Sequence, residues 1–226
     1  MDIGCGFGIH SVAALLSGAD PVVAINYDIK SVENAQQVIK SNWQNKNYSV
    51  FQGDILDSKL CLYEQLSNKK FDIVYSWGVL HHTGNSPMAL KKASAFTDAN
   101  GYFLFSVYGW TKFCWIWKKM KKWYCSTSKS KKQNAEKFYT LLFGFYLLLR
   151  FKSLKNHIKN YSQNKRGMDF YHDLRDWLGG YPYESISKRN VLSLVEPLGF
   201  KLIDCNVRKR SGLFGSGCDE YLFKKI

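Results

Sequence analysis

The chain has 226 residues, of which 46% are hydrophobic and 16% aromatic, and its formal net charge is +14. This length suits one globular domain, and the apolar content excludes a wholly disordered chain. The longest apolar run, residues 139–151, is shorter than the roughly 20 residues that a bilayer-spanning helix needs.

In the first hundred residues, short β-branched runs alternate with helical periodicity, which is typical of a parallel α/β sheet. The first helix is predicted to present an apolar face and to stop at Gly18; this face consists of Ile9, Val12, Ala13 and Leu16. A second helix carries Val32, Ala35 and Ile39. A third begins at Ser86-Pro87, with Ser86 as its N-cap.

Strands are predicted at residues 22–25, 48–52, 71–76, 102–107, 200–205 and 220–223. A turn at residues 98–101 leads into the strand at residues 102–107, which is the fifth strand when the short strand before Gly4 is counted as the first. The last two are expected to form an antiparallel pair at one edge of the sheet. A further helix, capped by Ser187, precedes this pair.

The positive charge is concentrated in one segment. Residues 110–170 hold 15 lysines and arginines against two acidic residues, whereas residues 1–109 hold 8 basic and 9 acidic residues. A basic amphipathic helix is predicted here, with Phe113, Trp117 and Met120 on its apolar face. Its opposite, solvated side is expected to carry Lys118, Lys119, Lys121 and Lys122. Residues 126–132 are predicted to be a loop, and a second helix is expected at residues 138–151.

The most informative string is DIGCGFG at residues 2–8, between a strand and a helix. Glycines allow the backbone to turn sharply and to approach a ligand closely. The dinucleotide-binding fingerprint would need glycine at position 9, which is Ile9, so a nicotinamide or flavin enzyme is disfavoured.

This string closely resembles motif I of the class I S-adenosylmethionine-dependent methyltransferases. Residues 71–83 resemble the fourth strand and following loop of that family, and residues 166–169 and 173–184 resemble a bacterial, small-molecule-type subgroup. The resemblance implies a Rossmann-like α/β fold, with a mostly parallel seven-stranded sheet, an antiparallel edge and a basic helical insertion after strand 5. It also implies one domain over residues 1–226, with a cofactor-binding core (1–109), the insertion (110–170) and a C-terminal part (171–226) that holds the last helix and two strands.

The implied cofactor is S-adenosyl-L-methionine. The residues that the resemblance places around it are Asp2, Gly4, Cys5, Gly6, Gly8, Asn26, Tyr27, Asp54, Ile55, Ser76 and Trp77. The family usually has an acidic residue where this chain has Asn26, and Asp28 either substitutes for it or caps the next helix. The chain also starts inside the first strand, so we expect an N-terminally truncated form that lacks upstream pocket-closing residues.

Two adjacent histidines follow the fourth strand. Either His82 or His81 is a candidate general base for an attacking hydroxyl, and the alternative is that they pack the loop. His172, Asp176 and Tyr181 are candidates for binding the acceptor, against the alternative of ordinary surface side chains. The six cysteines show no zinc-ligand spacing, so no metal is expected.

The acceptor is predicted to be a small molecule with a hydroxyl or an activated carbon. Residues 76–79, SWGV, lack the prolines of the Asn/Asp-Pro-Pro-Tyr string found in base amino-methyltransferases. The alternatives are an RNA methyltransferase, or an inactive truncated relative that serves as a basic binding module. The N-terminal string MDIGCGFG lacks the charged start and apolar stretch of a secretory signal, so a cytoplasmic location is expected.

Three hypotheses remain for residues 110–170. The segment is a substrate lid with solvated lysines, or it lies on an anionic membrane surface with Phe113, Trp117 and Met120 buried in lipid, or it binds RNA.

Overall fold

The computed structural model describes residues 1–42, 47–60, 66–164, 169–208 and 217–226. The chain forms two compact units, each with its own core: unit 1 comprises Met1–Cys114 and Glu184–Ile226, and unit 2 comprises Trp115–Tyr183. Unit 2 therefore extends beyond the insertion predicted at residues 110–170. The reason is that Phe170, Leu174 and Leu178 are buried together with Tyr124 in the core of unit 2.

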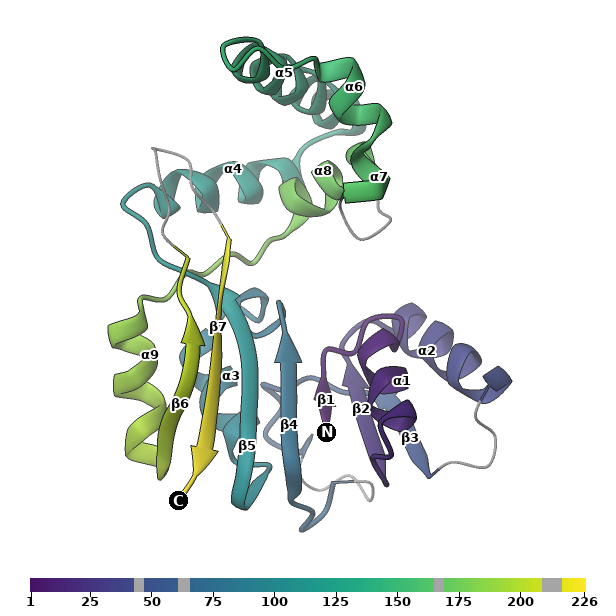
Figure 1. Cartoon of the computed structure of the whole chain (residues 1–226), viewed down its shortest axis with the longest axis vertical. Coiled ribbons are helices and arrows are strands. Elements are labelled where there is room, and N and C mark those ends of the chain that lie inside the picture. The colour runs from purple at the N-terminus through teal and green to yellow at the C-terminus, as the bar shows by residue number, and fades with distance from the viewer. Residues whose placement is uncertain (43–46, 61–65, 165–168, 209–216) are drawn as a thin grey trace. The chain divides into compact units, whose positions relative to one another are not determined.

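Unit 1 contains a seven-stranded sheet with the strand order β3-β2-β1-β4-β5-β7-β6 (Figure 1). The strands are β1 (Asp2–Ile3), β2 (Val22–Asn26), β3 (Tyr48–Gln52), β4 (Phe71–Trp77), β5 (Thr97–Tyr108), β6 (Phe200–Asn206) and β7 (Cys218–Lys225). β1 to β5 pair in parallel, whereas β7 lies between β5 and β6 and is antiparallel to both. The predicted mostly parallel sheet with an antiparallel edge is confirmed.

Helices pack on both faces of this sheet. They are α1 (Ile9–Leu16), α2 (Ile29–Asn42), α3 (Ser86–Ser94) and α9 (Lys188–Val195), with short 3₁₀ helices η2 (Leu80–His82) and η3 (Glu196–Leu198). On one face, Val22 and Ala24 of β2 pack with α1 and α2. On the other face, Val23 and Ile25 of the same strand share a core with α3 and α9. The alternation of a strand, which sends successive side chains to opposite faces, thus supplies both cores.

The apolar face predicted for the first helix is wrong. Ile9 and Leu16 are 72% and 68% exposed, whereas Ser11 and Leu15 are buried. Ser11 donates a hydrogen bond to the buried carboxylate of Asp2, and this bond turns the Ser11 side of α1 toward the sheet.

Two local boundaries also differ from the prediction. Residues 98–101 lie within β5 rather than before it, because the strand bulges there: Thr97 pairs with Phe71 but Tyr102 pairs with Ile73. The N-cap of α3 is Asn85, whose Oδ1 accepts from the Met88 N–H, so Ser86 is already inside the helix.

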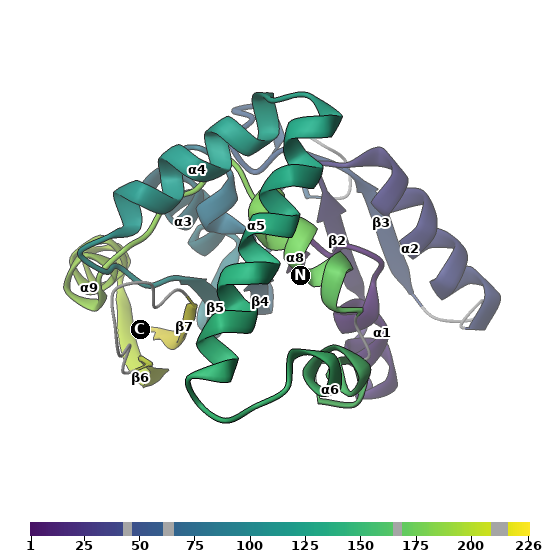
Figure 2. The same cartoon turned by 90° about the horizontal axis from the view of Figure 1, so that it is seen from above.

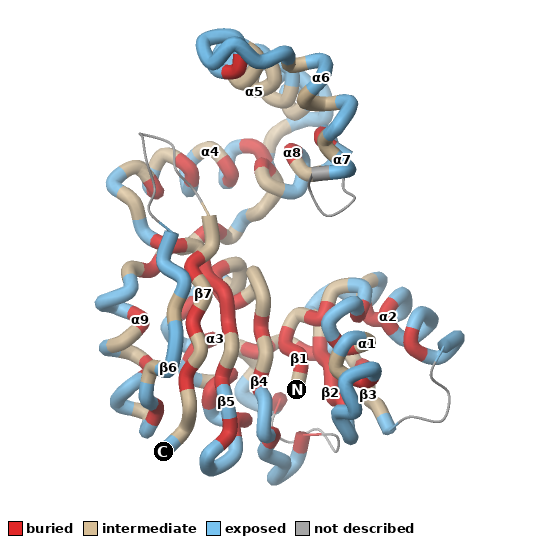
Figure 3. The backbone as a smooth tube through the Cα atoms, viewed as in Figure 1, coloured by how far each residue is buried: buried red, intermediate tan, exposed pale blue. Residues whose placement is uncertain are grey.

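Unit 2 is helical throughout its regular structure. Its helices are α4 (Cys114–Ser126), α5 (Lys129–Leu148), α6 (Leu154–Lys159), α7 (Tyr161–Asn164) and α8 (Phe170–Gly179). The predicted loop at 126–132 is shorter than expected, since α5 starts at Lys129 after the extended Ser128. Figure 3 shows the contrast with unit 1, because α5 is mostly exposed whereas β2 is almost wholly buried.

The prediction that all four lysines of α4 lie on a solvated side is wrong for Lys121. Lys121 is fully buried: its Nζ donates to the Trp177 carbonyl and lies 4.4 Å from the centroid of the Trp177 ring. Burial lowers the pKa of Lys121 to about 8. Among the described residues, no helix combines the length and the apolar character that crossing a bilayer requires.

Candidate functional site

The loop between β1 and α1 depends on its three glycines. Gly4, Gly6 and Gly8 all have positive φ, at 78°, 54° and 82°. The backbone N–H groups of Gly4 and Cys5 both donate to the carbonyl of Ile25, at 2.8 and 3.1 Å. This pairing turns the chain sharply at the end of β1 and directs it over the end of β2.

Gly4 also connects this loop to the one that follows β4. A Cβ added to Gly4 would lie 2.4 Å from Cγ2 of Val79, so no other residue fits without a shift. A Cβ on Gly6, by contrast, would meet nothing within 4 Å. The loop is therefore closed on the Val79 side and open beside Gly6.

Asp2 and Cys5 are both buried beside this loop. Asp2 accepts a hydrogen bond of 2.6 Å from the Ser11 hydroxyl, and burial raises the pKa of its carboxyl group. Burial, with a smaller contribution from the Asp2 charge, raises the pKa of the Cys5 thiol to about 12. Asp2 therefore orients the start of α1, and the Cys5 thiol stays protonated at neutral pH.

Asn26 ends β2 with its side chain turned back onto its own loop. Its Oδ1 accepts from the Asp28 N–H at 3.0 Å. Asp28 in turn accepts from the backbone N–H and the hydroxyl of Ser31, at 2.9 and 2.8 Å, so Asp28 caps the start of α2. Tyr27, between them, is 74% exposed. Of Asn26 and Asp28, Asn26 is thus the one whose side chain is not committed to a helix cap.

Asp54 and Ile55 follow β3, and they have different surroundings. Asp54 is half-buried, and its Oδ1 accepts from the Leu56 N–H at 2.8 Å. Ile55 is buried in the main core. The Gly53 N–H donates to the Asn26 carbonyl at 3.0 Å, which ties the ends of β2 and β3 together.

Ser76 and Trp77 end β4 and point to opposite faces. Ser76 is fully buried and donates its hydroxyl to the Ile3 carbonyl at 2.9 Å, so it links β4 to β1. Trp77 is half-buried and stacks on Tyr75, with ring centroids 5.8 Å apart. The Tyr75 hydroxyl lies 3.2 Å from Nδ1 of His10. Sequence reasoning missed Tyr75 and His10, although the two-residue spacing from Trp77 indicated that Tyr75 shares its face.

The two histidines of η2 have different surroundings. His81 is buried, and its Nδ1 accepts from the Tyr108 N–H at 3.2 Å, which leaves the proton of the neutral ring on Nε2. The His81 carbonyl accepts from the Glu184 N–H at 3.1 Å. His82 is half-buried, and its ring lies edge-on to Tyr108 with centroids 5.4 Å apart. His81 thus ties η2 to β5, whereas His82 retains a partly exposed ring.

Glu184, which the sequence analysis did not connect with the histidines, contacts the segment from η2 to the start of α3. Its carboxylate accepts from the Ser86 N–H at 2.6 Å, and Ser86 is almost 100 residues away along the chain. No local pattern signals a contact of this sequence separation.

The acceptor candidates His172, Asp176 and Tyr181 belong to unit 2. His172 and Asp176 lie one turn apart on α8, with Nε2 and Oδ2 3.7 Å apart and with both side chains more than 60% exposed. Tyr181 lies just beyond the end of α8 and is 36% exposed. This arrangement fits surface side chains, and a role in binding the acceptor stays a prediction.

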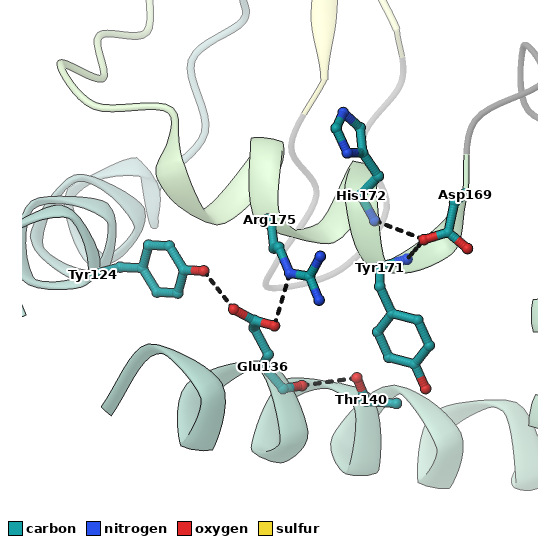
Figure 4. A network of polar contacts seen from close by, with 7 residues as sticks. All are labelled: Tyr124, Glu136, Thr140, Asp169, Tyr171, His172 and Arg175. Carbon is teal, nitrogen blue, oxygen red and sulfur yellow. Dashed lines mark hydrogen bonds and ion pairs between the residues drawn. The ribbon is translucent and has the colours of Figure 1, made fainter. Parts of the chain in front are cut away.

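A network of polar contacts joins α4, α5 and α8 near His172 (Figure 4). Glu136 accepts from the Tyr124 hydroxyl at 2.8 Å and from Nε of Arg175 at 3.1 Å. Asp169 caps α8 by accepting from the N–H groups of Tyr171 and His172. In Figure 4 the His172 ring points away from Glu136, so its side chain is not part of this network.

A pocket of about 590 Å³ lies elsewhere in unit 1, with Ile55, Leu66, Lys70 and Lys92 among its lining residues. Lys70 and Lys92 are engaged, because their Nζ atoms donate to the carbonyls of Ala95 and Leu56. The pocket shares only Ile55 with the predicted site, so we place the candidate site at the carboxyl ends of β1 to β4 instead.

Comparisons with known proteins agree on one family. A family model described as "Methyltransferase domain" matches residues 1–166. Ubiquinone biosynthesis O-methyltransferase of Pelagibacter ubique is 30% identical over 101 residues, which are 45% of this chain and 38% of that protein. Ribosomal protein L11 methyltransferase of Bacillus pumilus is 40% identical over 57 residues, 25% of this chain and 18% of that protein. The matches thus span well under half of either curated relative.

Solved structures agree on the fold. Magnesium protoporphyrin IX methyltransferase of Synechocystis, crystallised with S-adenosylhomocysteine, superposes with a TM-score of 0.55 at 15% identity, over 100% of this chain and 73% of that one. At this identity the likeness concerns the fold alone.

Proposed function

Since the chain belongs to the family of class I S-adenosylmethionine-dependent methyltransferases, we propose that unit 1 binds S-adenosylmethionine at the ends of β1 to β4 and transfers its methyl group to a small-molecule hydroxyl. The observation that carries the proposal is the glycine loop, which is closed against Val79 and open beside Gly6. A ligand can therefore approach the backbone at Gly6 without meeting a side chain.

The residues around this opening suit the parts of the cofactor. Asn26 has a carbonyl oxygen with two lone pairs, of which the Asp28 N–H uses one, so a ribose hydroxyl can donate to the other. Asp54 is half-buried, and a carboxylate accepts hydrogen bonds from an adenine amino group. Ser76 supports the site indirectly by holding β4 to β1, since its hydroxyl is buried against the Ile3 carbonyl.

The chemistry of methyl transfer leaves the protein mainly a positioning task. When bound, the cofactor supplies a methyl group that its sulfonium already activates. Unit 1 has to hold the acceptor oxygen in line with that methyl group and to exclude water. A base must also take the proton that the hydroxyl releases as its oxygen forms the new bond to carbon.

His82 is the base in this proposal. Its ring is half-buried on η2, directly after the β4 loop that contacts Gly4. His81 is committed through Nδ1 to the Tyr108 N–H and acts as a positioning residue for η2. The O-methyltransferase among the relatives supports a hydroxyl acceptor. A histidine base supports it independently, since a hydroxyl oxygen must lose its proton and imidazole can accept it.

Calorimetry with S-adenosylhomocysteine tests the cofactor site without knowledge of the acceptor. Wild type is expected to bind, and Gly6→Ala is expected to bind at least tenfold more weakly, about 1.4 kcal/mol, because its methyl group enters the open space beside the loop. Gly18→Ala is the matched control, since Gly18 also has positive φ and nothing within 4 Å of its added Cβ. Failure of wild type to bind would favour the binding-module alternative instead.

The base is tested by His82→Ala in an assay of S-adenosylhomocysteine release with a panel of phenols and alcohols. Turnover should fall by roughly 10²–10⁴-fold, while the affinity for S-adenosylhomocysteine stays unchanged. Full turnover in the variant would assign the ring a packing role.

A further inference from the structure

The C-terminal half of α5 is apolar on both of its sides. One side packs into unit 2 through Tyr139 and Phe143, which lie against the core residues of α4 and α8. The opposite side, with the end of the helix, forms an outer apolar face whose members are 52% to 100% exposed: Leu141, Leu142, Phe145, Leu148, Leu149 and Phe151. Large exposed apolar surfaces of this kind mark interaction sites.

The sequence around the outer apolar face is purely cationic. Residues 137–164 contain Lys137, Arg150, Lys152, Lys155 and Lys159 and no acidic residue. The nearest preceding carboxylate, that of Glu136, is engaged inside unit 2 by Tyr124 and Arg175. The surface therefore combines exposed leucine and phenylalanine side chains with uncompensated positive charge.

The apolar face predicted for α4 is largely buried. Trp117 is only 7% exposed and packs edge-on to Trp177, with centroids 4.6 Å apart, and Met120 packs against the same core. The face of α4 predicted to enter a membrane is thus turned into unit 2. Trp115 and Trp123 of α4 remain 57% and 47% exposed, but the larger accessible apolar surface lies on α5. Figure 2 looks onto α5 with no other ribbon of unit 2 in front of it.

We propose that the outer apolar face of α5 docks on an anionic lipid surface. Its leucines and phenylalanines would enter the boundary between head groups and acyl chains, and the flanking lysines would contact lipid phosphates. The helix would lie along the surface, because no helix of the described residues can cross a bilayer. This contact is independent of the proposed methyl transfer and needs no cofactor.

Two other occupants fit less well. RNA binding uses aromatic side chains on which bases stack, whereas half of the eight exposed large apolar side chains in residues 138–151 are leucines, which cannot stack on bases. A second copy of the chain would bring like charges together, since Arg150, Lys152 and Lys155 border the face. An anionic bilayer matches both the apolar and the cationic character of the surface.

Vesicle co-sedimentation with the full chain tests the proposal. Binding is expected to vesicles of equal parts phosphatidylcholine and phosphatidylglycerol, and much weaker binding to phosphatidylcholine alone. It should weaken as NaCl rises from about 0.1 M to about 1 M, because the Debye length falls from about 10 Å to about 3 Å. Absence of binding to the anionic vesicles would overturn the proposal.

Paired variants separate the two contributions. Leu141→Ser with Phe145→Ser should weaken binding at least tenfold, whereas Ile203→Ser with Val207→Ser, exposed apolar residues of unit 1, should not. Lys152→Gln with Lys155→Gln should weaken it roughly 25-fold, at roughly fivefold per charge. Lys69→Gln with Lys91→Gln makes the same charge change in unit 1 and should leave binding intact.

Circular dichroism checks that the serine variant keeps its helix, and the lysine variant tests the surface without touching any apolar contact. Variants that bind as wild type would overturn the proposal. RNA retention without vesicle binding, or a dimer in sedimentation that the serine variant disrupts, would also overturn it and would assign the surface to RNA or to a second copy.

Discussion

Unit 1 shapes its candidate site with backbone, whereas unit 2 places a lysine side chain inside an aromatic core. In unit 1, the N–H groups of Gly4 and Cys5 share the Ile25 carbonyl, and the positive φ of Gly4 sets the direction of the loop. In unit 2, Lys121 donates to the Trp177 carbonyl and the Tyr161 hydroxyl donates to Asp173. A backbone device demands particular residues at fixed spacing, while a side-chain network can be built from many combinations.

The difference has an energetic side as well. A glycine at positive φ relieves strain, so replacing it destabilises the fold. A lysine buried among aromatic rings costs free energy at neutral pH, since burial opposes its charge. We therefore expect replacement of Gly4 in unit 1 to lower the free energy of unfolding and replacement of Lys121 in unit 2 to raise it.

The largest effect is expected for Gly4→Ala. A side chain at positive φ costs about 1–3 kcal/mol, and overpacking costs a further 1–3 kcal/mol. Both apply here, because the added Cβ would lie 2.4 Å from Val79. Urea denaturation should show a loss of about 3 kcal/mol or more.

Gly6→Ala is the matched comparison, since it shares the loop and the positive φ but meets nothing within 4 Å. It should lose only about 1 kcal/mol of stability. Equal losses in the two variants would show that the Val79 contact contributes nothing.

Lys121→Met should have the next largest effect, in the opposite direction. Burial lowers the pKa of Lys121 from 10.5 to about 8, which corresponds to roughly 3 kcal/mol at pH 7. Methionine keeps the length of the side chain without its charge, but it loses the bond to the Trp177 carbonyl and the contact of the ammonium with the Trp177 ring. The net gain in the free energy of unfolding at pH 7 should be about 2 kcal/mol.

The pH dependence provides the check. Between pH 8 and 10 the unfolded chain keeps a proton on Lys121 that the folded chain has lost, so this residue's contribution to wild-type stability should rise with pH. The advantage of Lys121→Met should shrink over the same interval in urea titrations. A variant less stable than wild type at every pH would mean that the hydrogen bond outweighs desolvation.

The sequence predicted unit 1 well because its signals are local. The spacing of Gly4, Gly6 and Gly8 identified the loop, and the apolar runs located β2 to β4 within about a residue at each end. The face of α1 was missed because a polar contact, Ser11 to Asp2, outweighs the pattern of exposed Ile9 and Leu16. From sequence alone, a serine such as Ser11 is predicted to be exposed, and only its hydrogen bond to Asp2 explains its burial.

Unit 2 was harder to predict because α5 is apolar on both sides and therefore has no single stripe. Periodicity cannot tell Phe143, which faces the core, from Phe145, which is exposed. Likewise, Lys121 lies among lysines that are exposed, and only tertiary contacts distinguish it. The contact of Glu184 with Ser86 depends on residues distant in sequence, for which one chain contains no signal.

The smallest predicted effect concerns Asn26, where unit 1 departs from the acidic residue usual in its family. Asn26→Asp should strengthen the binding of S-adenosylhomocysteine by about 1 kcal/mol, because hydrogen bonds to a charged acceptor are worth about 1.5–3 kcal/mol against about 1 kcal/mol for a neutral one. The substitution keeps an oxygen to accept from the Asp28 N–H, so the loop should not change.

Calorimetry measures this change, and Asp28→Asn is the control. Asp28 caps α2 through Ser31, so its variant should lower the free energy of unfolding only slightly while leaving the affinity for S-adenosylhomocysteine unaltered. If Asn26→Asp leaves the affinity unchanged and Asp28→Asn weakens it, the ribose is held by Asp28. If neither variant changes the affinity, the loop after β2 does not contact the ribose, and cofactor binding depends on the glycine loop and Asp54.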